Sequence, residues 1–110
     1  MVIYVPDRGD LVWLQFDPQT GHEQAGRRPA LTLSPKAYNE KVGLAIFCPV
    51  TGNEKGYPFE VKIDDQQIQG VILADQVKSL DWKKRDAKFI IKAPLRIVNE
   101  VIKLLGTLVN

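Results

Sequence analysis

The sequence has few of the side chains that build disulfides and zinc sites. It contains one cysteine, Cys48, and one histidine, His22, among 110 residues. A single cysteine excludes a disulfide within the chain, which is typical of a reducing compartment. One cysteine and one histidine also cannot supply the four ligands of a structural zinc site. We therefore expect a fold held by its hydrophobic core, without a disulfide or a structural metal.

The sequence also has no segment that would carry it to or through a membrane. No apolar run approaches the roughly 20 residues that span a bilayer. Residues 1–7 show neither the basic start nor the long apolar core of a secretory signal. We expect a cytoplasmic protein with no membrane association.

Common catalytic motifs are missing as well. There is no Gly-rich phosphate loop of the Walker type, no Gly-x-Ser-x-Gly elbow and no carboxylate cluster with the spacing of a two-metal nuclease. We therefore expect no cofactor and no metal. A nuclease built from this chain would act on RNA, because the 2′-OH of RNA can itself attack the neighbouring phosphorus. The protein would then supply an acid, a base and an arginine that neutralises the transition-state charge.

Length and charge set only broad limits on the domain organisation and the binding partners. A chain of 110 residues fits one compact domain over residues 1–110, and because its core is modest, dimerisation is a reasonable expectation. The net charge is +2, which alone says little about nucleic-acid binding. The basic residues gather in two places, Arg27-Arg28 and Lys83-Lys84-Arg85.

Short stretches rich in strand-forming residues recur along the chain, separated by turn signals. Phe59, Val61 and Ile63 alternate with polar neighbours, as in a half-buried strand, whereas residues 44–50 are almost wholly apolar and predict a central strand. Ser34 as N-cap and Pro35 at the first helical position predict a short helix to about residue 39. The predicted strands cover residues 11–16, 30–33, 44–50, 59–64, 71–74, 76–80 and 87–92.

The C-terminal segment follows a different period. Apolar residues at positions 95, 98, 102 and 105 recur at helical spacing after Pro94, and Gly106 falls near the expected end of this helix. Many short strands and one C-terminal helix predict a mainly β fold. We expect a small, strongly bent antiparallel sheet or barrel that is closed by the helix.

Residues 17–28 form a polar segment that is unusually long for a small domain unless it is functional. His22 is the side chain whose intrinsic titration lies closest to neutrality. Glu23 is able to act as a base or to orient one, and Arg28 is able to donate two parallel hydrogen bonds to a phosphate. The structural alternatives are a solvated or capping histidine, a solvent-facing carboxylate and a surface salt bridge.

Two polar residues directly follow apolar strands. Thr51 comes after the run that ends in Val50, and Asp75 comes after residues 71–74. The sequence alone favours a structural interpretation for both, namely a strand-end cap for Thr51 and a carboxylate bonded to nearby backbone amides for Asp75. Cys48 lies within an apolar strand and is expected to be an inert buried thiol.

Seven short blocks follow one another over nearly the whole chain. They are GDLVW at residues 9–13, DP at 17–18, GHEQAGRRPA at 21–30, LSP at 33–35, PVT at 49–51, KGYPFEV at 55–61 and LADQVKS at 73–79. In this order they resemble the MazF/PemK toxins of bacterial toxin–antitoxin pairs, with the greatest likeness to the MazF branch. The coverage makes the match specific, since any single block would be weak.

The resemblance implies an SH3-like barrel with a C-terminal helix, in agreement with the strand pattern. It implies a homodimer whose shared groove binds single-stranded RNA. Cleavage within short sequence motifs would leave a 2′,3′-cyclic phosphate and a 5′-OH. An acidic, partly disordered antitoxin tail of the MazE type would occupy the same groove, because an acidic peptide can mimic a phosphate backbone and fold on binding.

The resemblance also implies roles for individual residues. The family's glutamate of the Gly-x-Glu-Gln loop falls on Glu23, its arginine before proline on Arg28, and its active-site threonine on Thr51. We expect Arg28 to stabilise the transition-state phosphate and Thr51 to hold a phosphate oxygen. Glu23 or His22 would supply the acid–base function or position the attacking hydroxyl.

The PemK-like branch implies two further catalytic residues. Its loop histidine falls on His22, and its later aspartate falls on Asp75. That branch also carries an arginine two residues before the aspartate, where this chain has Leu73, so the PemK-type set is incomplete. Further RNA contacts are expected from Gln24, Arg27, Lys55 and Gln76.

The sequence therefore predicts a sequence-specific, metal-independent endoribonuclease that cuts single-stranded RNA. Two alternatives stand beside it. One is a gyrase-poisoning toxin of the CcdB type, which the same fold can host; the intact segment from residue 21 to 29 argues against it. The other is a non-catalytic SH3-like module that binds RNA by charge and stacking. An antitoxin-like reading frame just upstream would favour either toxin over the simple binder.

Overall fold

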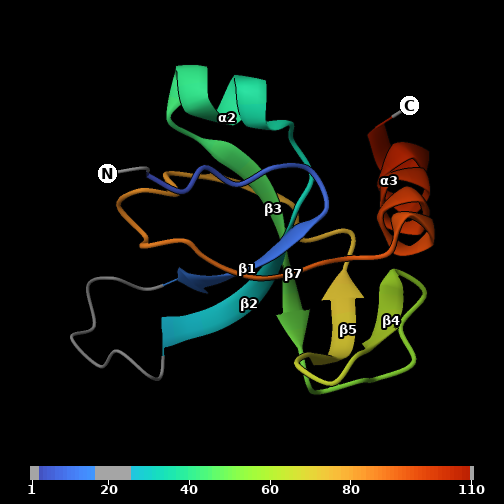
Figure 1. Ribbon diagram of the computed structural model, residues 1–110. Coiled ribbons are helices and arrows are strands. Elements are labelled where there is room, and N and C mark those ends of the chain that lie inside the picture. Colours follow the sequence, from blue (N-terminus) through green and yellow to red (C-terminus); the bar gives the residue numbers. More distant parts are fainter. Residues whose placement is uncertain (1–2, 17–25, 110) are drawn as a thin grey trace.

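The computed structural model describes residues 3–16 and 26–109 of the chain. Within these residues, short strands alternate with tight connections, and two helices interrupt the series (Figure 1). Neither of these helices has the length and apolar character needed to cross a membrane. The elements are β1 (Asp10–Gln15), β2 (Arg27–Thr32), α2 (Lys36–Val42), β3 (Ala45–Thr51), β4 (Glu60–Asp64), β5 (Gln69–Leu73), β6 (Lys78–Leu80), β7 (Lys88–Lys92) and α3 (Leu95–Val109).

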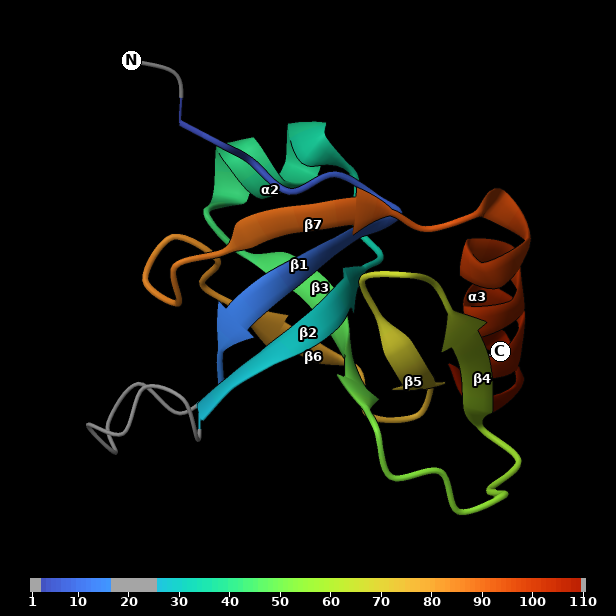
Figure 2. The same cartoon turned by 60° about the horizontal axis from the view of Figure 1, so that its bottom comes forward.

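The strands form one antiparallel sheet in the order β4-β5-β3-β2-β1-β7, and β6 pairs with β3 outside this path. One edge of β3 pairs with β2, from Phe47 to Pro49. Its other edge is shared: residues 45–47 pair with β6, and residues 50–51 pair with β5. The sheet is curled, and Figure 2 shows β1 and β2 crossing at an angle to β4 and β5. This confirms the predicted mainly β, strongly bent antiparallel sheet with a C-terminal helix.

Two groups of buried side chains lie on opposite faces of β1, β2 and β3, because neighbouring residues of these strands belong to different groups. The larger group joins β3, β4 and β5 to α3, whose residues Ile97, Val98 and Val101 point inward. The smaller group centres on Phe47 and Trp82, between β1, β2 and the turn after β6. The predicted alternation in β4 is confirmed, since Val61 and Ile63 are buried while their neighbours face outward. Amphipathic strands of this kind bury one face each and so fix their register.

The predicted N-cap at Ser34 is wrong. Helix α2 begins at Lys36, and its N-cap residue, Pro35, makes no side-chain cap bond. The Lys36 amide donates to Asp7 Oδ1 at 2.8 Å. The buried Ser34 hydroxyl instead donates to Asn39 Oδ1 at 2.6 Å and accepts the Ile46 amide at 2.8 Å. Helix α2 also runs past residue 39 and ends at Gly43, whose φ of 83° supplies the left-handed conformation of a C-cap. A tertiary contact to β3 has therefore outweighed the local capping preference.

Two element ends also differ from the prediction. Strand β2 begins at Arg27, three residues before the predicted start, because its first residues pair with β1 from Gln15 onward. Helix α3 continues through Gly106 to Val109. A glycine inside a helix costs about 1 kcal/mol, which is too little to end a helix whose first turns are anchored in the core.

Asn39 is the polar residue on which the α2 end of the fold depends. It is fully buried, and its Nδ2 donates to Pro6 O at 2.7 Å and to Ser34 O at 3.0 Å. We predict that Asn39→Ala lowers the free energy of unfolding by about 2–5 kcal/mol, because it leaves buried carbonyls without donors. Urea denaturation measures this, with Asn99→Ala on the exposed face of α3 as the control. A loss below about 1 kcal/mol for Asn39→Ala would contradict the assignment.

Cys48 gives a second test of the core. The side chain is fully buried, and burial, followed by the charge of Asp75, raises the pKa of the thiol to about 12. Because the thiolate is the reactive form, we expect no labelling by a thiol reagent at pH 8 until the protein is unfolded. Rapid labelling of the native protein would show that this part of the core opens.

Candidate functional site

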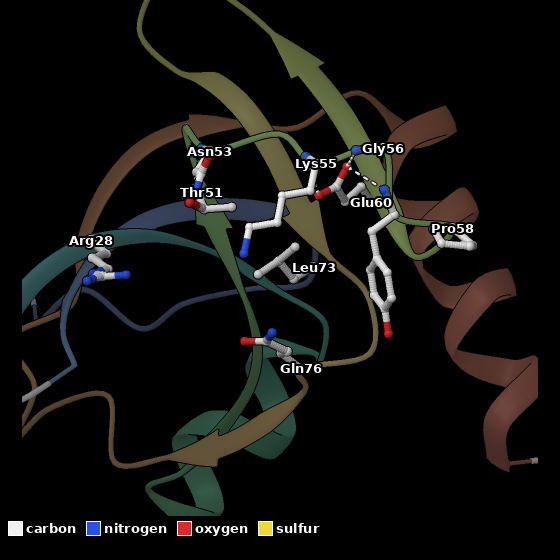
Figure 3. A pocket seen from close by; sticks show the side chains of 10 residues that line it. Arg28, Thr51, Asn53, Lys55, Gly56, Pro58, Glu60, Leu73 and Gln76 are labelled. Atoms are coloured by element: carbon white, nitrogen blue, oxygen red, sulfur yellow. Dashed lines mark hydrogen bonds between the residues drawn. The ribbon is translucent and has the colours of Figure 1, made fainter.

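A hollow of about 600 Å³ opens where the ends of β2 and β3 meet the connection between β3 and β4. Figure 3 shows Arg28, Thr51, Lys55 and Gln76 around this pocket, each from a different part of the chain. The described residues that line it are Arg28, Thr51, Asn53, Lys55, Gly56, Tyr57, Pro58, Glu60, Leu73 and Gln76. Two cationic groups, two hydroxyls and two side-chain amides therefore share one concave surface with a single carboxylate.

Arg28 and Thr51 form the strand wall of the pocket. The pairing of β2 with β3 ends at Ala30 and Pro49. Arg28 and Thr51 each lie two residues beyond this last pair, and both line the pocket. Arg28 is exposed, and its backbone is fixed by pairing with Leu14 of β1. The guanidinium therefore stands on a rigid strand, where it can offer parallel hydrogen bonds to a phosphate.

The Thr51 side chain is already partly engaged. Its Oγ1 accepts a hydrogen bond from the Asn53 amide at 3.2 Å, so the strand-end cap expected from the sequence is present. An accepting hydroxyl keeps its own proton to donate. The structural and the functional interpretations of Thr51 are thus compatible, because the cap orients a hydroxyl that can donate toward a phosphate oxygen.

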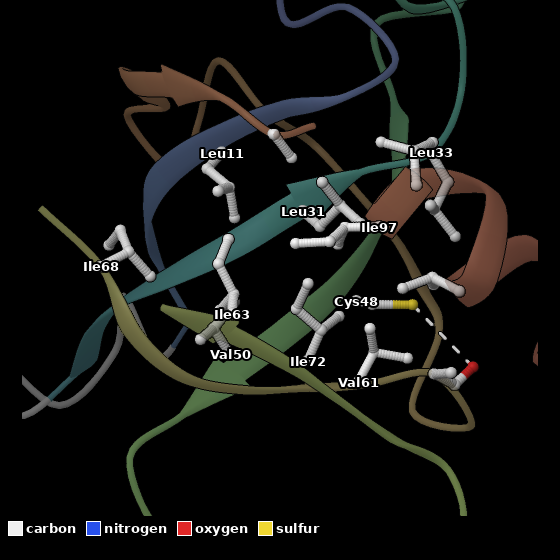
Figure 4. Close-up of a cluster of buried hydrophobic side chains, with 14 residues drawn as sticks. Leu11, Leu31, Leu33, Cys48, Val50, Val61, Ile63, Ile68, Ile72 and Ile97 are labelled. Atoms are coloured by element: carbon white, nitrogen blue, oxygen red, sulfur yellow. Dashed lines mark hydrogen bonds between the residues drawn. The ribbon is translucent and has the colours of Figure 1, made fainter. Parts of the chain in front are cut away.

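The strand wall is backed by the larger hydrophobic core. Val50 and Ile72 pair across β3 and β5, and both are buried beside Leu31 (Figure 4). At the end of this pairing β5 comes very close to Thr51. A Cβ added to Gly70, whose φ is +149°, would lie 2.3 Å from Thr51 O. Glycine is therefore required at position 70 for Thr51 to hold its place.

Asp75 lies just beyond β5 and contacts the other wall. Its Oδ2 accepts a hydrogen bond from the Tyr57 hydroxyl at 2.7 Å, while its Oδ1 is buried and has no hydrogen-bond partner among the described residues. This hydrogen bond, together with the negative charge of Asp75, raises the pKa of Tyr57. The predicted partners of Asp75 were backbone amides, and the structure shows a tyrosine hydroxyl instead.

The structure brings together some of the predicted site residues and not others. Arg28, Thr51, Lys55 and Gln76 all line the pocket. Arg27 does not; it lies 3.7 Å from Asp86 in an ion pair. Three candidates, His22, Glu23 and Gln24, lie outside the described residues.

Three polar residues of the pocket have no individual role in the sequence prediction. Asn53, Tyr57 and Glu60 all line the hollow. Tyr57 and Glu60 belong to the KGYPFEV block, which contributes to the family likeness. A signal was present in that block, because a polar connection with glycine and proline beside a strand is a common place for functional side chains.

The donor set of the pocket favours an anionic ligand over a metal ion. The lining residues include two cations, Arg28 and Lys55, and one carboxylate, Glu60. The other polar groups of the lining are hydroxyls and amides. In residues 3–16 and 26–109, no three His, Cys, Asp or Glu side chains come close enough to hold a metal ion. The arrangement suits a phosphodiester, with arginine and lysine as charge partners.

Gly70 provides a test of how the strand wall is built. We predict that Gly70→Ala lowers the free energy of unfolding by about 2 kcal/mol or more, because the added methyl meets backbone atoms that cannot rotate away. Gly52→Ala is the matched control, since a Cβ there meets nothing within 4 Å. Denaturant titration of both variants measures the difference. Equal stability of the two would mean that β5 does not approach Thr51 as described.

Comparison with known proteins adds to this geometry. Residues 7–109 match the family model described as PemK-like, MazF-like toxin of type II toxin–antitoxin system. The endoribonuclease toxin MazF of Escherichia coli K12 is 57% identical over 84 residues, which is 76% of each chain. The endoribonuclease PemK of Escherichia coli is 37% identical over 109 residues, covering 94% of this chain and 82% of PemK.

A solved structure has the same fold over nearly the full length. The crystal structure of MazE–MazF from Deinococcus radiodurans superposes with a TM-score of 0.87 at 49% identity, covering 98% of both chains. The family model and the two curated relatives agree with this match. The chain therefore belongs to the PemK-like, MazF-like toxin family of type II toxin–antitoxin systems.

Proposed function

We propose that this protein is an endoribonuclease toxin that cuts single-stranded RNA at specific sequences and without a metal ion. The observation that carries the proposal is that Arg28 and Thr51 line one cationic pocket, in a chain 57% identical to an endoribonuclease of the same family. The match over residues 7–109 also supports one toxin domain spanning residues 1–110.

In the proposed reaction the RNA supplies its own nucleophile, so no metal is needed to activate water. The 2′ oxygen attacks the adjacent phosphorus as a base removes its proton, and the bond from phosphorus to the 5′ oxygen breaks as an acid protonates that oxygen. The products are a 2′,3′-cyclic phosphate and a 5′-OH. Negative charge builds on the non-bridging oxygens, where preorganised donors are most effective.

The pocket residues divide this work. Arg28 binds the non-bridging oxygens and stabilises the transition state. The Thr51 hydroxyl donates a hydrogen bond to one of these oxygens. Lys55 points into the pocket (Figure 3) and provides a second cation for the RNA backbone. Gln76 offers both a donor and an acceptor to a base or ribose. Glu23 or His22, outside the described residues, supplies the acid–base function.

The PemK-type catalytic set remains incomplete in this proposal. Leu73 lines the pocket at the position where the PemK-like branch carries an arginine. An apolar side chain cannot neutralise a phosphate, so Arg28 would carry that task. Gln24 and Arg27 remain proposed RNA contacts, and Arg27 would first have to leave Asp86.

The proposed partners follow from charge and apolar surface. An acidic antitoxin of the MazE type would compete with RNA for Arg28 and Lys55, and the Deinococcus relative has a solved MazE–MazF structure. A second copy of the chain would cover exposed apolar residues of α3, since Leu95, Ile102 and Val109 are spaced by seven and share one helical face. We further propose a cytoplasmic location, where RNA and antitoxin are available.

Cleavage of a long single-stranded RNA in EDTA tests the proposal. We predict discrete cuts with cyclic-phosphate and 5′-OH ends. Arg28→Ala should lower the rate by about 10²–10³, because a transition-state donor is lost. Thr51→Val should also lower the cleavage rate. Arg96→Ala, which removes an exposed arginine of α3 that lines a different hollow, is the matched control and should cut normally.

The other outcomes separate the alternative functions. RNA that is bound but stays intact would favour a non-catalytic RNA-binding module. Neither binding nor cleavage would favour the gyrase-poisoning type, which a DNA gyrase inhibition assay then tests. Cuts that persist in Arg28→Ala at the wild-type rate would remove Arg28 from the mechanism.

A further inference from the structure

The second wall of the pocket is a connection that the sheet does not hold by itself. Strand β3 ends at Thr51 and β4 begins at Glu60, and the residues between them form no strand or helix. Asn53, Lys55 and Tyr57 of this connection reach the pocket, and all three are exposed. A segment with so little burial would be expected to open easily unless specific bonds fix it.

Glu60 provides such bonds. Its Oε2 accepts the Lys55 amide at 3.0 Å, and its Oε1 accepts the amides of Gly56 at 3.0 Å and Tyr57 at 3.1 Å. Figure 3 shows the carboxylate turned toward these amides. Three successive N–H groups that converge in this way form an anion-binding nest. Gly56, with a φ of 75°, supplies the left-handed conformation that brings the amides together.

Glu60 is itself firmly placed. It is the first residue of β4 and pairs with Leu73 of β5, next to the fully buried Val61. A further hydrogen bond holds the Tyr57 side chain of the connection, because its hydroxyl donates to Asp75 Oδ2 at 2.7 Å. The connection is therefore fastened to the sheet at β4 and just beyond β5.

From this geometry we propose that Glu60 is a positioning residue, whose carboxylate holds residues 55–57 so that Lys55 faces the RNA backbone. This inference rests on the proposed function. Arg28 and Thr51 stand on strands, and Asn53, the connection residue that contacts Thr51, is not among the three residues whose amides Glu60 holds. Lys55 is one of those three. Loss of the carboxylate should therefore weaken RNA binding and leave the chemical step nearly unchanged. Asp75 acts in the same way through Tyr57, as a positioning residue and not in proton transfer.

Charge alone predicts the opposite result. Glu60 is a negative group at the edge of a site for a polyanion, and its removal would tighten RNA binding if electrostatics were its only effect. Glu60→Gln removes the charge and leaves one oxygen where two now serve three amides. The sign of the change in affinity therefore separates positioning from simple repulsion.

The experiment compares wild-type protein with Glu60→Gln, Tyr57→Phe and the control Glu54→Gln. Glu54 lies in the same connection, and its contact is an exposed ion pair with Lys62 at 3.9 Å. Binding is measured with an RNA oligonucleotide that carries the mapped cleavage motif and a 2′-deoxy nucleotide at the cut. Single-turnover cleavage of the all-RNA form gives the chemical rate. Hydrogen exchange of residues 53–57 and thermal unfolding report on structure without requiring activity.

We expect Glu60→Gln to raise the Kd by roughly tenfold, from the loss of charge-assisted hydrogen bonds, with a chemical rate within about twofold of wild type. Amides 55–57 should exchange faster while the rest of the sheet and the melting temperature stay unchanged. Tyr57→Phe should raise the Kd by about threefold, since one bond is lost. Glu54→Gln should bind as tightly as wild type or slightly more tightly.

Two results would overturn the inference. Equal or tighter binding by Glu60→Gln with unchanged exchange would make Glu60 a passive surface charge. Faster exchange throughout β4 and β5 with a lower melting temperature would make it a general stabiliser of the sheet. If the wild-type protein neither binds nor cuts the RNA, the proposed function fails, and the exchange result alone decides whether Glu60 holds the connection.

Discussion

The double use of β3 is the constraint on which the rest of this structure depends. One edge of the strand pairs with β2, and the other passes from β6 to β5 along its length. The sheet curls along this strand, and right-handed strand twist favours such curling. Gly70 makes the last step possible, because any side chain there would strike the backbone of Thr51. The strand that organises the core thus also places Thr51.

The two walls of the pocket are held in place by different kinds of contact. The strand wall presents Arg28 and Thr51 from paired β-strands over a buried core, which suits groups that must meet a transition state precisely. The other wall is a connection that carries Lys55 and is held by three hydrogen bonds that its backbone amides donate to the Glu60 carboxylate. A division into a rigid chemical wall and an adjustable binding wall would allow the RNA preference to change while the chemistry is retained.

Much of the fold followed from local patterns, because alternation in β4 and the apolar run of β3 report burial directly. The role of Ser34 did not: the local pattern predicted an N-cap, whereas the hydroxyl bonds Asn39 and the Ile46 amide of β3, which no local pattern reveals. The site was predicted in part. Arg28 was named from its chemistry, but its place beside Thr51 depends on strand register, and the role of Glu60 depends on backbone amides that converge only after folding.

The central claim is that Arg28 and Thr51 hold a phosphate while the RNA's own 2′-OH attacks it. The most direct test is single-turnover cleavage of an RNA oligonucleotide that carries the mapped motif, compared with the same oligonucleotide with hydrogen in place of the 2′-OH at the nucleotide before the cut. We predict equal binding of both and no cleavage of the deoxy form. Cleavage of the deoxy form at a comparable rate would mean that water or a protein group is the nucleophile, and would contradict the account.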